Sequence, residues 1–146
     1  MKSSILYIFF IFLNLNLTAQ EMEINANKIQ YDDINKVTIF EGNVSSRDEN
    51  GNRIFSEYAK YNKVDEIIET VGRTKIITSK GYKILSSNII LDNKRKIILS
   101  DYKTEIEDTD GNKISVEMFN YSTFTNILFS KGNIEVFDIN NNSYFF

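Results

Sequence analysis

The strongest candidates for metal binding or acid–base chemistry in this chain are carboxylates. The 146 residues include 20 Asp and Glu but no His and no Cys. That composition excludes the usual Zn and Cu ligands, the Ser–His and Cys–His nucleophilic pairs, and disulfide bonds. The acids gather in polar turns, most clearly in the stretches DENGN at 48–52 and DTDGN at 108–112.

These carboxylates fit neither a metal site nor a catalytic pair. Asp108 and Asp110 precede Gly111 as in a calcium-binding loop, but the first ligand position would then be Ile106, which cannot bind a cation. A polysaccharide-cleaving enzyme needs two acids that face one bond. The acids here lie in separate turns, far apart in the pattern: Asp32, Asp48, Asp92 and Asp108. The sequence therefore predicts a protein that is not an enzyme, with no catalytic residue, metal or cofactor.

The charge pattern also argues against a nucleic-acid partner. The formal net charge is −3, and no long basic run is present. The triplet Lys94-Arg95-Lys96 is interpreted as part of a solvated turn rather than as a phosphate site, because Lys36 occupies the same place in another copy of the pattern.

A repeat organises the chain. The segment Ile29–Ile54 superposes without a gap on Ile89–Ile114, sixty residues later. The period also halves to thirty residues: glycines recur at Gly42, Gly72 and Gly132, with Tyr102 in the equivalent place of the third unit. A repeated unit that cannot bury its apolar side alone must stack on its neighbours.

Each unit has the pattern of two strands. Apolar residues alternate between turn signals, β-branched and aromatic residues dominate, and no helical pattern follows residue 20. We expect an all-β fold of about four thirty-residue, two-stranded units, forming a β-solenoid-like stack or an open β-jellyroll with an apolar interior. Before Gly42 the apolar residues Val37 and Ile39 occupy odd positions, and Val44 after it is even, which predicts a bulge or corner at the glycine.

The N-terminal segment has the pattern of a signal peptide. Lys2 precedes the apolar run Ile5–Leu13, which is too short to span a bilayer but suits a signal peptide. Cleavage after Ala19 would leave a mature domain at 20–146 that is exported. The alternative is an uncleaved N-terminal anchor.

Further motifs mark the first unit and its neighbours. The stretch begins A-x-x-I-x-Y-D at 26–32, continues F-E-G-N-V at 40–44 and D-x-x-G-x-x-I at 48–54, and closes on S-E-Y-A-K-Y-N at 56–62 and V-G-x-T-x-I at 71–76. This pattern resembles the OstA-like family of lipopolysaccharide transport, which includes the periplasmic bridge protein LptA and the N-terminal periplasmic domain of the outer-membrane assembly protein LptD. The likeness covers residues 22–146.

The resemblance implies a non-enzymatic periplasmic carrier. An open β-jellyroll would hold the lipid A acyl chains of lipopolysaccharide in an apolar trough, and edge strands would join like domains into a bridge toward the outer-membrane assembly complex. The expected partner edges contain Met22, Ile24, Tyr144 and Phe145. The expected trough lining is Ile29, Tyr31, Val37, Ile39, Val44, Ile54, Tyr61, Ile67, Ile76, Ile84, Ile89, Leu91, Ile97, Leu99, Ile114, Phe119, Tyr121 and Ile127.

Two alternatives stay open. The chain reaches Tyr144-Phe145-Phe146 within an expected strand, which favours a piece of the longer assembly protein over a free-standing bridge protein. An exported structural or adhesive repeat protein, with a filled core and no lipid ligand, would share the repeat and the signal peptide.

Overall fold

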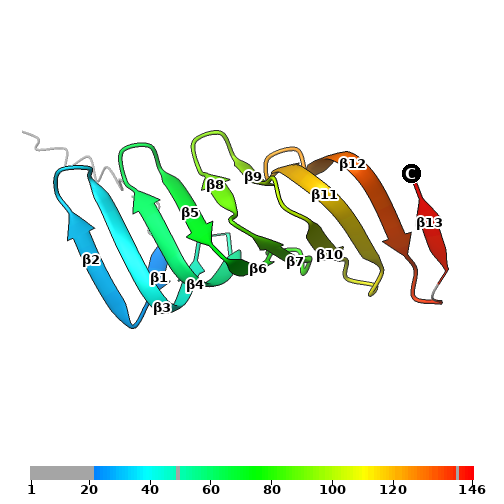
Figure 1. Ribbon diagram of the computed structural model, residues 1–146, viewed down its shortest axis with the longest axis horizontal. Coiled ribbons are helices and arrows are strands. Elements are labelled where there is room, and N and C mark those ends of the chain that lie inside the picture. Colours follow the sequence, from blue (N-terminus) through cyan, green and yellow to red (C-terminus); the bar gives the residue numbers. More distant parts are fainter. Residues whose placement is uncertain (1–21, 49, 141) are drawn as a thin grey trace, which may run out of the picture.

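The protein is built from antiparallel β-structure. The computed structural model describes residues 22–48, 50–140 and 142–146, and in these ranges it has strands but no helix (Figure 1). The predicted all-β class is confirmed. The predicted signal peptide, residues 1–19, lies outside the described residues.

Thirteen strands form one sheet along the length of the molecule, from β2 at one end to β13 at the other (Figure 1). In chain order they are β1 (Glu23–Asn25), β2 (Lys28–Asp32), β3 (Val37–Arg47), β4 (Arg53–Asn62), β5 (Ile67–Val71), β6 (Arg73–Ile77), β7 (Lys83–Ser87), β8 (Ile90–Asp92), β9 (Ile97–Ser100), β10 (Thr104–Glu107), β11 (Lys113–Ser122), β12 (Ile127–Phe137) and β13 (Ser143–Phe145).

The sheet folds over along a line through the middle of its long strands. The long strand β4 pairs with β5 through its C-terminal half and with β6 through its N-terminal half. Thr70 in β5 and Thr74 in β6 would be about 13 Å apart in an extended strand. Their Oγ1 atoms are instead 2.8 Å apart, because the chain turns sharply at Gly72, where φ is +78°.

This bend divides the sheet into two walls. The first wall consists of β2, β5, β8, β9 and the long-strand segments 37–41, 58–62, 118–122 and 127–131. The second wall consists of β1, β6, β7, β10, β13 and the segments 44–47, 53–56, 113–116 and 134–137.

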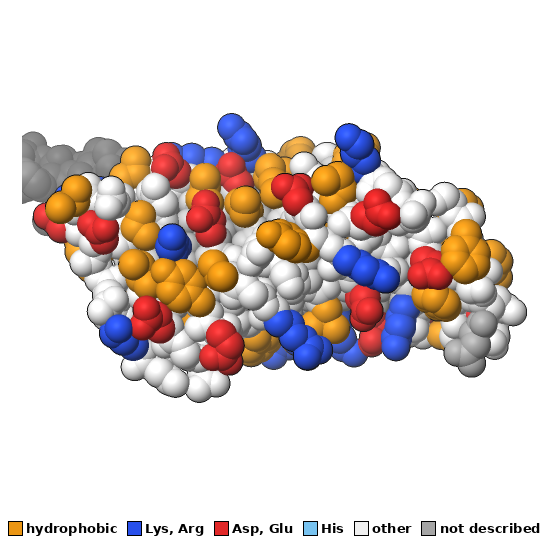
Figure 2. All heavy atoms as spheres, in the orientation of Figure 1, with side chains coloured by type: hydrophobic (Ala, Val, Ile, Leu, Met, Phe, Trp, Pro, Cys, Tyr) orange, Lys and Arg blue, Asp and Glu red, His pale blue; other side chains and the backbone are white. Residues whose placement is uncertain are grey.

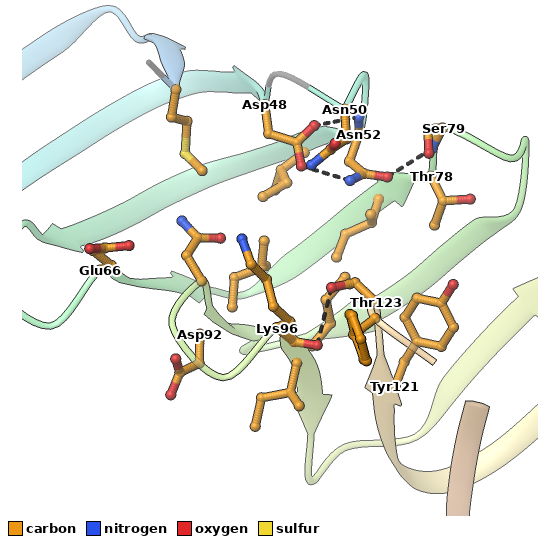
Figure 3. A pocket seen from close by; sticks show the side chains of 18 of the residues that line it. Asp48, Asn50, Asn52, Glu66, Thr78, Ser79, Asp92, Lys96, Tyr121 and Thr123 are labelled. Atoms are coloured by element: carbon orange, nitrogen blue, oxygen red, sulfur yellow. Dashed lines mark hydrogen bonds between the residues drawn. The ribbon is translucent and has the colours of Figure 1, made fainter. Parts of the chain in front are cut away.

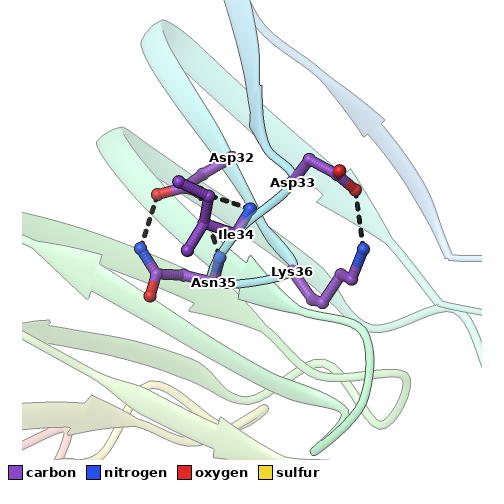
Figure 4. A network of polar contacts seen from close by, with 5 residues as sticks. All are labelled: Asp32, Asp33, Ile34, Asn35 and Lys36. Carbon is purple, nitrogen blue, oxygen red and sulfur yellow. Dashed lines mark hydrogen bonds and ion pairs between the residues drawn. The ribbon is translucent and has the colours of Figure 1, made fainter.

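Polar side chains close the turns at the free rim of each wall. At the first turn, the carboxylate of Asp32 accepts hydrogen bonds from the N–H groups of Ile34 and Asn35, both at 3.0 Å, and Lys36 pairs with Asp33 at 2.6 Å (Figure 4). Asn62, Asp92 and Ser122 cap the equivalent turns of later units. Turns of this chemistry explain the spacing of the acidic residues.

The core lies between the walls as rows of side chains that run across the strands. Directly paired residues share a face of the sheet. One row of the second wall is almost entirely aliphatic: Ile24, Ser46, Ile54, Ile76, Ile84, Ile106, Ile114, Val136 and Tyr144. The facing row of the first wall is Tyr31, Thr38, Tyr61, Ile68, Leu91, Ile98, Tyr121 and Leu128, and we call it the mouth row.

Hydroxyl groups occupy the fold line in the middle of the molecule. Thr104 Oγ1 lies 2.7 Å from Ser86 Oγ, which lies 3.0 Å from Ser100 Oγ. The row is buried and consists of two hydrogen-bonded groups, one of Ser56, Thr70 and Thr74 and the other of Ser86, Ser100 and Thr104. Toward both ends of the fold line, apolar residues such as Val44 and Val116 take these places.

The bulge predicted near Gly42 is present, but the predicted change of side-chain direction there is wrong. The β3–β4 register shifts between Glu41 and Val44. Phe40 and Val44 are both buried, at 6 % and 4 % exposure, so the inward positions are even on both sides of the glycine. The direction changes on the partner strand instead, where Ser56 and Ala59 are both buried three residues apart. Tyr102, the third-unit equivalent of Gly42, is not among the positive-φ residues, so that corner is formed differently.

Candidate functional site

An open cleft of about 760 Å³ lies between the free rims of the two walls. Ile54 and Ile76 of the second wall line its floor, and Leu91 and Ile98 of the first wall face them. Figure 3 shows that the labelled side chains come from turns and strands of both walls. The cleft is thus a large part of the interior that the protein's own side chains do not fill.

The rim of the cleft is polar. On the second wall, Asn52 donates to the Asp48 carboxylate at 2.6 Å and accepts from the Ser79 N–H at 2.8 Å (Figure 3). On the first wall, the Thr123 N–H donates to the Lys96 carbonyl at 2.8 Å. These contacts fix the turns that carry the rim side chains.

Two equivalent tyrosines mark the boundary between floor and rim. Tyr61 and Tyr121 lie sixty residues apart in the mouth row, and both line the cleft. Burial raises the pKa of each phenol above its ordinary value of 10.0, so both stay neutral at physiological pH. The Tyr121 hydroxyl donates to Asn126 at 3.0 Å. A tyrosine with an apolar ring and a hydrogen-bonding tip suits such a boundary.

The fold line below the cleft offers no open polar group. Every buried side-chain nitrogen or oxygen among the described residues has a hydrogen-bond partner. Thr70 Oγ1, for example, accepts from the Ile89 N–H at 2.9 Å. We conclude that the hydroxyl row stabilises the bend and has no unsatisfied polar group.

The structure brings together about two thirds of the residues expected to line a trough. The following ones face the interior: Ile29, Tyr31, Val44, Ile54, Tyr61, Ile76, Ile84, Ile89, Leu91, Ile114, Phe119 and Tyr121. Ile29 and Tyr31 face inward on β2 yet are 56 % and 61 % exposed, because none of the described strands covers them at that end. Contact of any of these residues with lipid stays a prediction.

The other expected lining residues occupy different places. Five of them alternate with inward-facing residues along their strands and therefore lie on the outer face of the first wall: Val37, Ile39, Ile67, Leu99 and Ile127. Ile97 shares that register but borders the mouth of the cleft, at the end of β9. The surface shown in Figure 2 carries apolar side chains interspersed with charged ones, not one continuous apolar patch.

Sequence reasoning missed several residues of the cleft. Ile98 forms part of the floor, and Lys63 and Lys80 stand at the rim. Lys96, which the sequence analysis assigned to a solvated turn, also stands at the rim. The signal for Ile98 was available in the repeat, since Ile68 and Leu128 occupy the same position in the neighbouring units.

The expected partner edges lie at the two ends of the sheet. Met22 lines the cleft, and Ile24 lies in β1, the first strand of the second wall. Tyr144 and Phe145 lie in β13, which pairs only with β12 among the described strands. They are 48 % and 71 % exposed.

The described part of the chain shows no cluster of acids suited to metal binding. No group of three or more Asp and Glu side chains comes together there. Asp108, the acid of the calcium-like loop, is bonded instead to the Asn112 side chain at 2.7 Å. Within the described ranges no helix is long and apolar enough to cross a bilayer.

Comparison with known proteins identifies a fold but no sequence family. No protein-family model matches the chain, and no curated protein matches its sequence. Among solved structures it is similar to LptH from Pseudomonas aeruginosa, described as the LptA-homologous periplasmic component of the conserved lipopolysaccharide transport device. The two superpose with a TM-score of 0.70 at 15 % identity, over 80 % of this chain and 94 % of that one. The chain therefore has the β-jellyroll fold of LptA-like proteins.

Proposed function

We propose that this protein is a non-enzymatic periplasmic carrier, which binds the acyl chains of lipopolysaccharide in the cleft and passes the lipid toward the outer membrane. The observation that carries the proposal is an unfilled cleft with an aliphatic floor and a polar rim. The fold shared with LptH, a component of a lipopolysaccharide transport device, supports it. Export would use residues 1–19 as a signal peptide.

The physical chemistry of the cleft suits an amphiphile. Its volume falls within the roughly 300–1,000 Å³ typical of ligand sites. Each methylene moved from water to the floor contributes about 0.8 kcal/mol, so an acyl chain of about ten buried carbons contributes roughly 8 kcal/mol. The rim keeps water and hydrogen-bonding groups near a polar head. Transport of this kind requires no bond to be made or broken.

We further propose that like domains add to the ends of the sheet. Ile29 and Tyr31 continue the inward rows to one end, where they stay exposed. At the other end, Phe146 and Ile134 exchange both backbone hydrogen bonds, at 3.0 and 3.1 Å. Because hydrogen-bonding direction alternates along an antiparallel strand, the N–H groups of Ser143 and Phe145 point away from β12. A strand of another domain, or of an outer-membrane assembly complex, can pair there.

Site-specific photocrosslinking tests the carrier function. A photoreactive residue at Tyr61 or Tyr121, facing the cleft, is expected to crosslink to lipopolysaccharide in the purified mature chain. The same residue at Ile39 or Leu99, on the outer face of the same wall, is the matched control and should not. Crosslinks at none of the four positions would contradict the proposal and favour a structural or adhesive repeat protein with a filled core.

Sedimentation tests the end-to-end assembly. Phe145→Pro removes an outward N–H while sparing the N–H groups that face β12, so it should abolish concentration-dependent association and leave the fold intact. Phe145→Val keeps the N–H and should still associate. Equal association of the two variants would show that this edge is not used.

A further inference from the structure

Three lysines from both walls surround the mouth of the cleft. Lys63 and Lys96 belong to turns of the first wall, and Lys80 to the facing turn of the second wall, and all three line the opening. Figure 3 shows the Lys96 side chain extending across the cleft toward the wall that carries Asp48 and Asn52. All three are exposed, so their ammonium groups are accessible.

These lysines are not neutralised by ion pairs within the described part of the chain. The four ion pairs found there use other basic residues: Lys28, Lys36, Lys83 and Arg95. Lys94, beside Lys96 in the same turn, is also occupied, because its Nζ donates to the Val64 carbonyl at 2.5 Å.

The acids at the mouth are largely occupied by their own turns. Asp48 accepts from the backbone and the side chain of Asn52 at 2.8 and 2.6 Å. Asp92 is 8 % exposed and accepts from the Arg95 N–H at 2.8 Å. Among the described acids lining the cleft, only Glu66 has no such bond to a turn. The lining of the mouth thus carries three lysines and three carboxylates, and Asp92 is also paired with Arg95 at 3.6 Å. Lys63, Lys80 and Lys96 are therefore the exposed cations that an anion can reach there.

We propose that this mouth binds the phosphate of a lipid headgroup, with Lys63, Lys80 and Lys96 as its cationic contacts. The ligand class is then an anionic phospho-amphiphile: its acyl chains lie on the aliphatic floor and its phosphate lies between the two rims. Lysine binds phosphate as a point charge and through three rotatable donors, so fixed bidentate geometry is not required. The inference rests on the proposed carrier function and assigns the head of the ligand to named residues.

The experiment compares two lipids and two triple variants of the mature chain. The probes are bisphosphorylated lipid A and the same lipid with both phosphates removed. The test variant is Lys63→Gln/Lys80→Gln/Lys96→Gln. The control is Lys60→Gln/Lys75→Gln/Lys103→Gln, which removes the same charge from exposed positions that do not line the cleft. Dissociation constants are measured at low and high salt.

The test variant should bind bisphosphorylated lipid A about tenfold more weakly than wild type at low salt, from three exposed charge contacts of modest individual strength. It should bind the dephosphorylated lipid as wild type does, and the control should bind both lipids normally. The difference should shrink at 1 M salt, where screening is strong. Inorganic phosphate alone should bind far more weakly than lipid A, since it lacks the acyl chains.

Each contrary result has a distinct meaning. Unchanged binding of bisphosphorylated lipid A by the test variant would overturn the assignment of the headgroup while leaving the carrier function standing. Failure of the wild-type chain to bind either lipid would overturn the carrier function and the headgroup assignment together. Inorganic phosphate binding as tight as that of lipid A would show an anion site that is independent of the amphiphile.

Discussion

Two equivalent isoleucines report whether the cleft is open in solution. Ile68 and Ile98 occupy the same place in consecutive units, and each is 2 % exposed. Ile98 lines the main cleft, whereas Ile68 lines only a small cavity of about 10 Å³. Substitution of each by Ala therefore makes the same chemical change in two different surroundings. An open cleft predicts unequal costs, and a filled core predicts equal ones.

The expected difference follows from the cavity left behind. Ile→Ala removes three carbons, which costs about 2.4 kcal/mol in lost transfer free energy at either site. At Ile68 the space stays mostly enclosed, and a residual cavity of about 70 Å³ adds roughly 1.7 kcal/mol. At Ile98 the space joins the cleft, so most of that second cost disappears. We expect destabilisation of about 4 kcal/mol for Ile68→Ala and about 2.5 kcal/mol for Ile98→Ala.

Urea unfolding followed by circular dichroism measures both values, with the slope of the unfolding free energy checked for constancy. Ile68→Val and Ile98→Val serve as controls, because loss of one carbon leaves too little space for the surroundings to matter and should cost about 1 kcal/mol at each site. Equal values for the two Ala variants, or a larger loss at Ile98, would refute the open cleft.

The remaining predictions concern the corners and the turns. Gly42→Ala should destabilise the chain more than Gly72→Ala in chemical denaturation. Both glycines have positive φ, which costs an L-residue about 1–2 kcal/mol. A Cβ at Gly42 would lie 2.9 Å from the Asn27 side chain, whereas a Cβ at Gly72 would meet nothing within 4 Å. Equal losses would mean that backbone strain alone decides. The Asn112 side chain holds the pKa of Asp108 below 3.8, so the stability that this bond contributes is present above that pH and is lost as the pH falls through the lower folded-state pKa. Asn112→Ala should thus be less stable than wild type at pH 6, and the difference in stability should shrink as the pH falls below 3.8; a difference that is unchanged by pH would contradict this.

The repeat and its turns were predictable because their chemistry is local. Glycines with positive φ, such as Gly51 and Gly111, mark tight reversals whatever the rest of the chain does. The all-β class follows from the same signals. The thirty-residue spacing then places equivalent residues in one row, two strands apart, as Ile54 and Ile84 are with Ile76 between them.

The inward face of the first wall was only partly predictable from hydropathy. Apolar residues such as Ile39 and Leu99 lie on its outer face, while the inward positions near the fold line hold hydroxyls such as Thr70 and Ser100. A buried threonine that satisfies its own hydrogen bonds looks like a surface residue in the sequence, so alternation pointed to the wrong side of these strands. Only tertiary contacts across the bend distinguish the two faces.

The strict thirty-residue period has a consequence for how such proteins change length. Each unit adds two strand widths, about 10 Å, without altering the alignment of any other row. Gain or loss of one whole unit would extend or shorten the groove in discrete steps, whereas loss of a single residue within a strand would turn every following side chain of that strand to the opposite face. Duplication of a unit is therefore a mechanically simple route to a longer span.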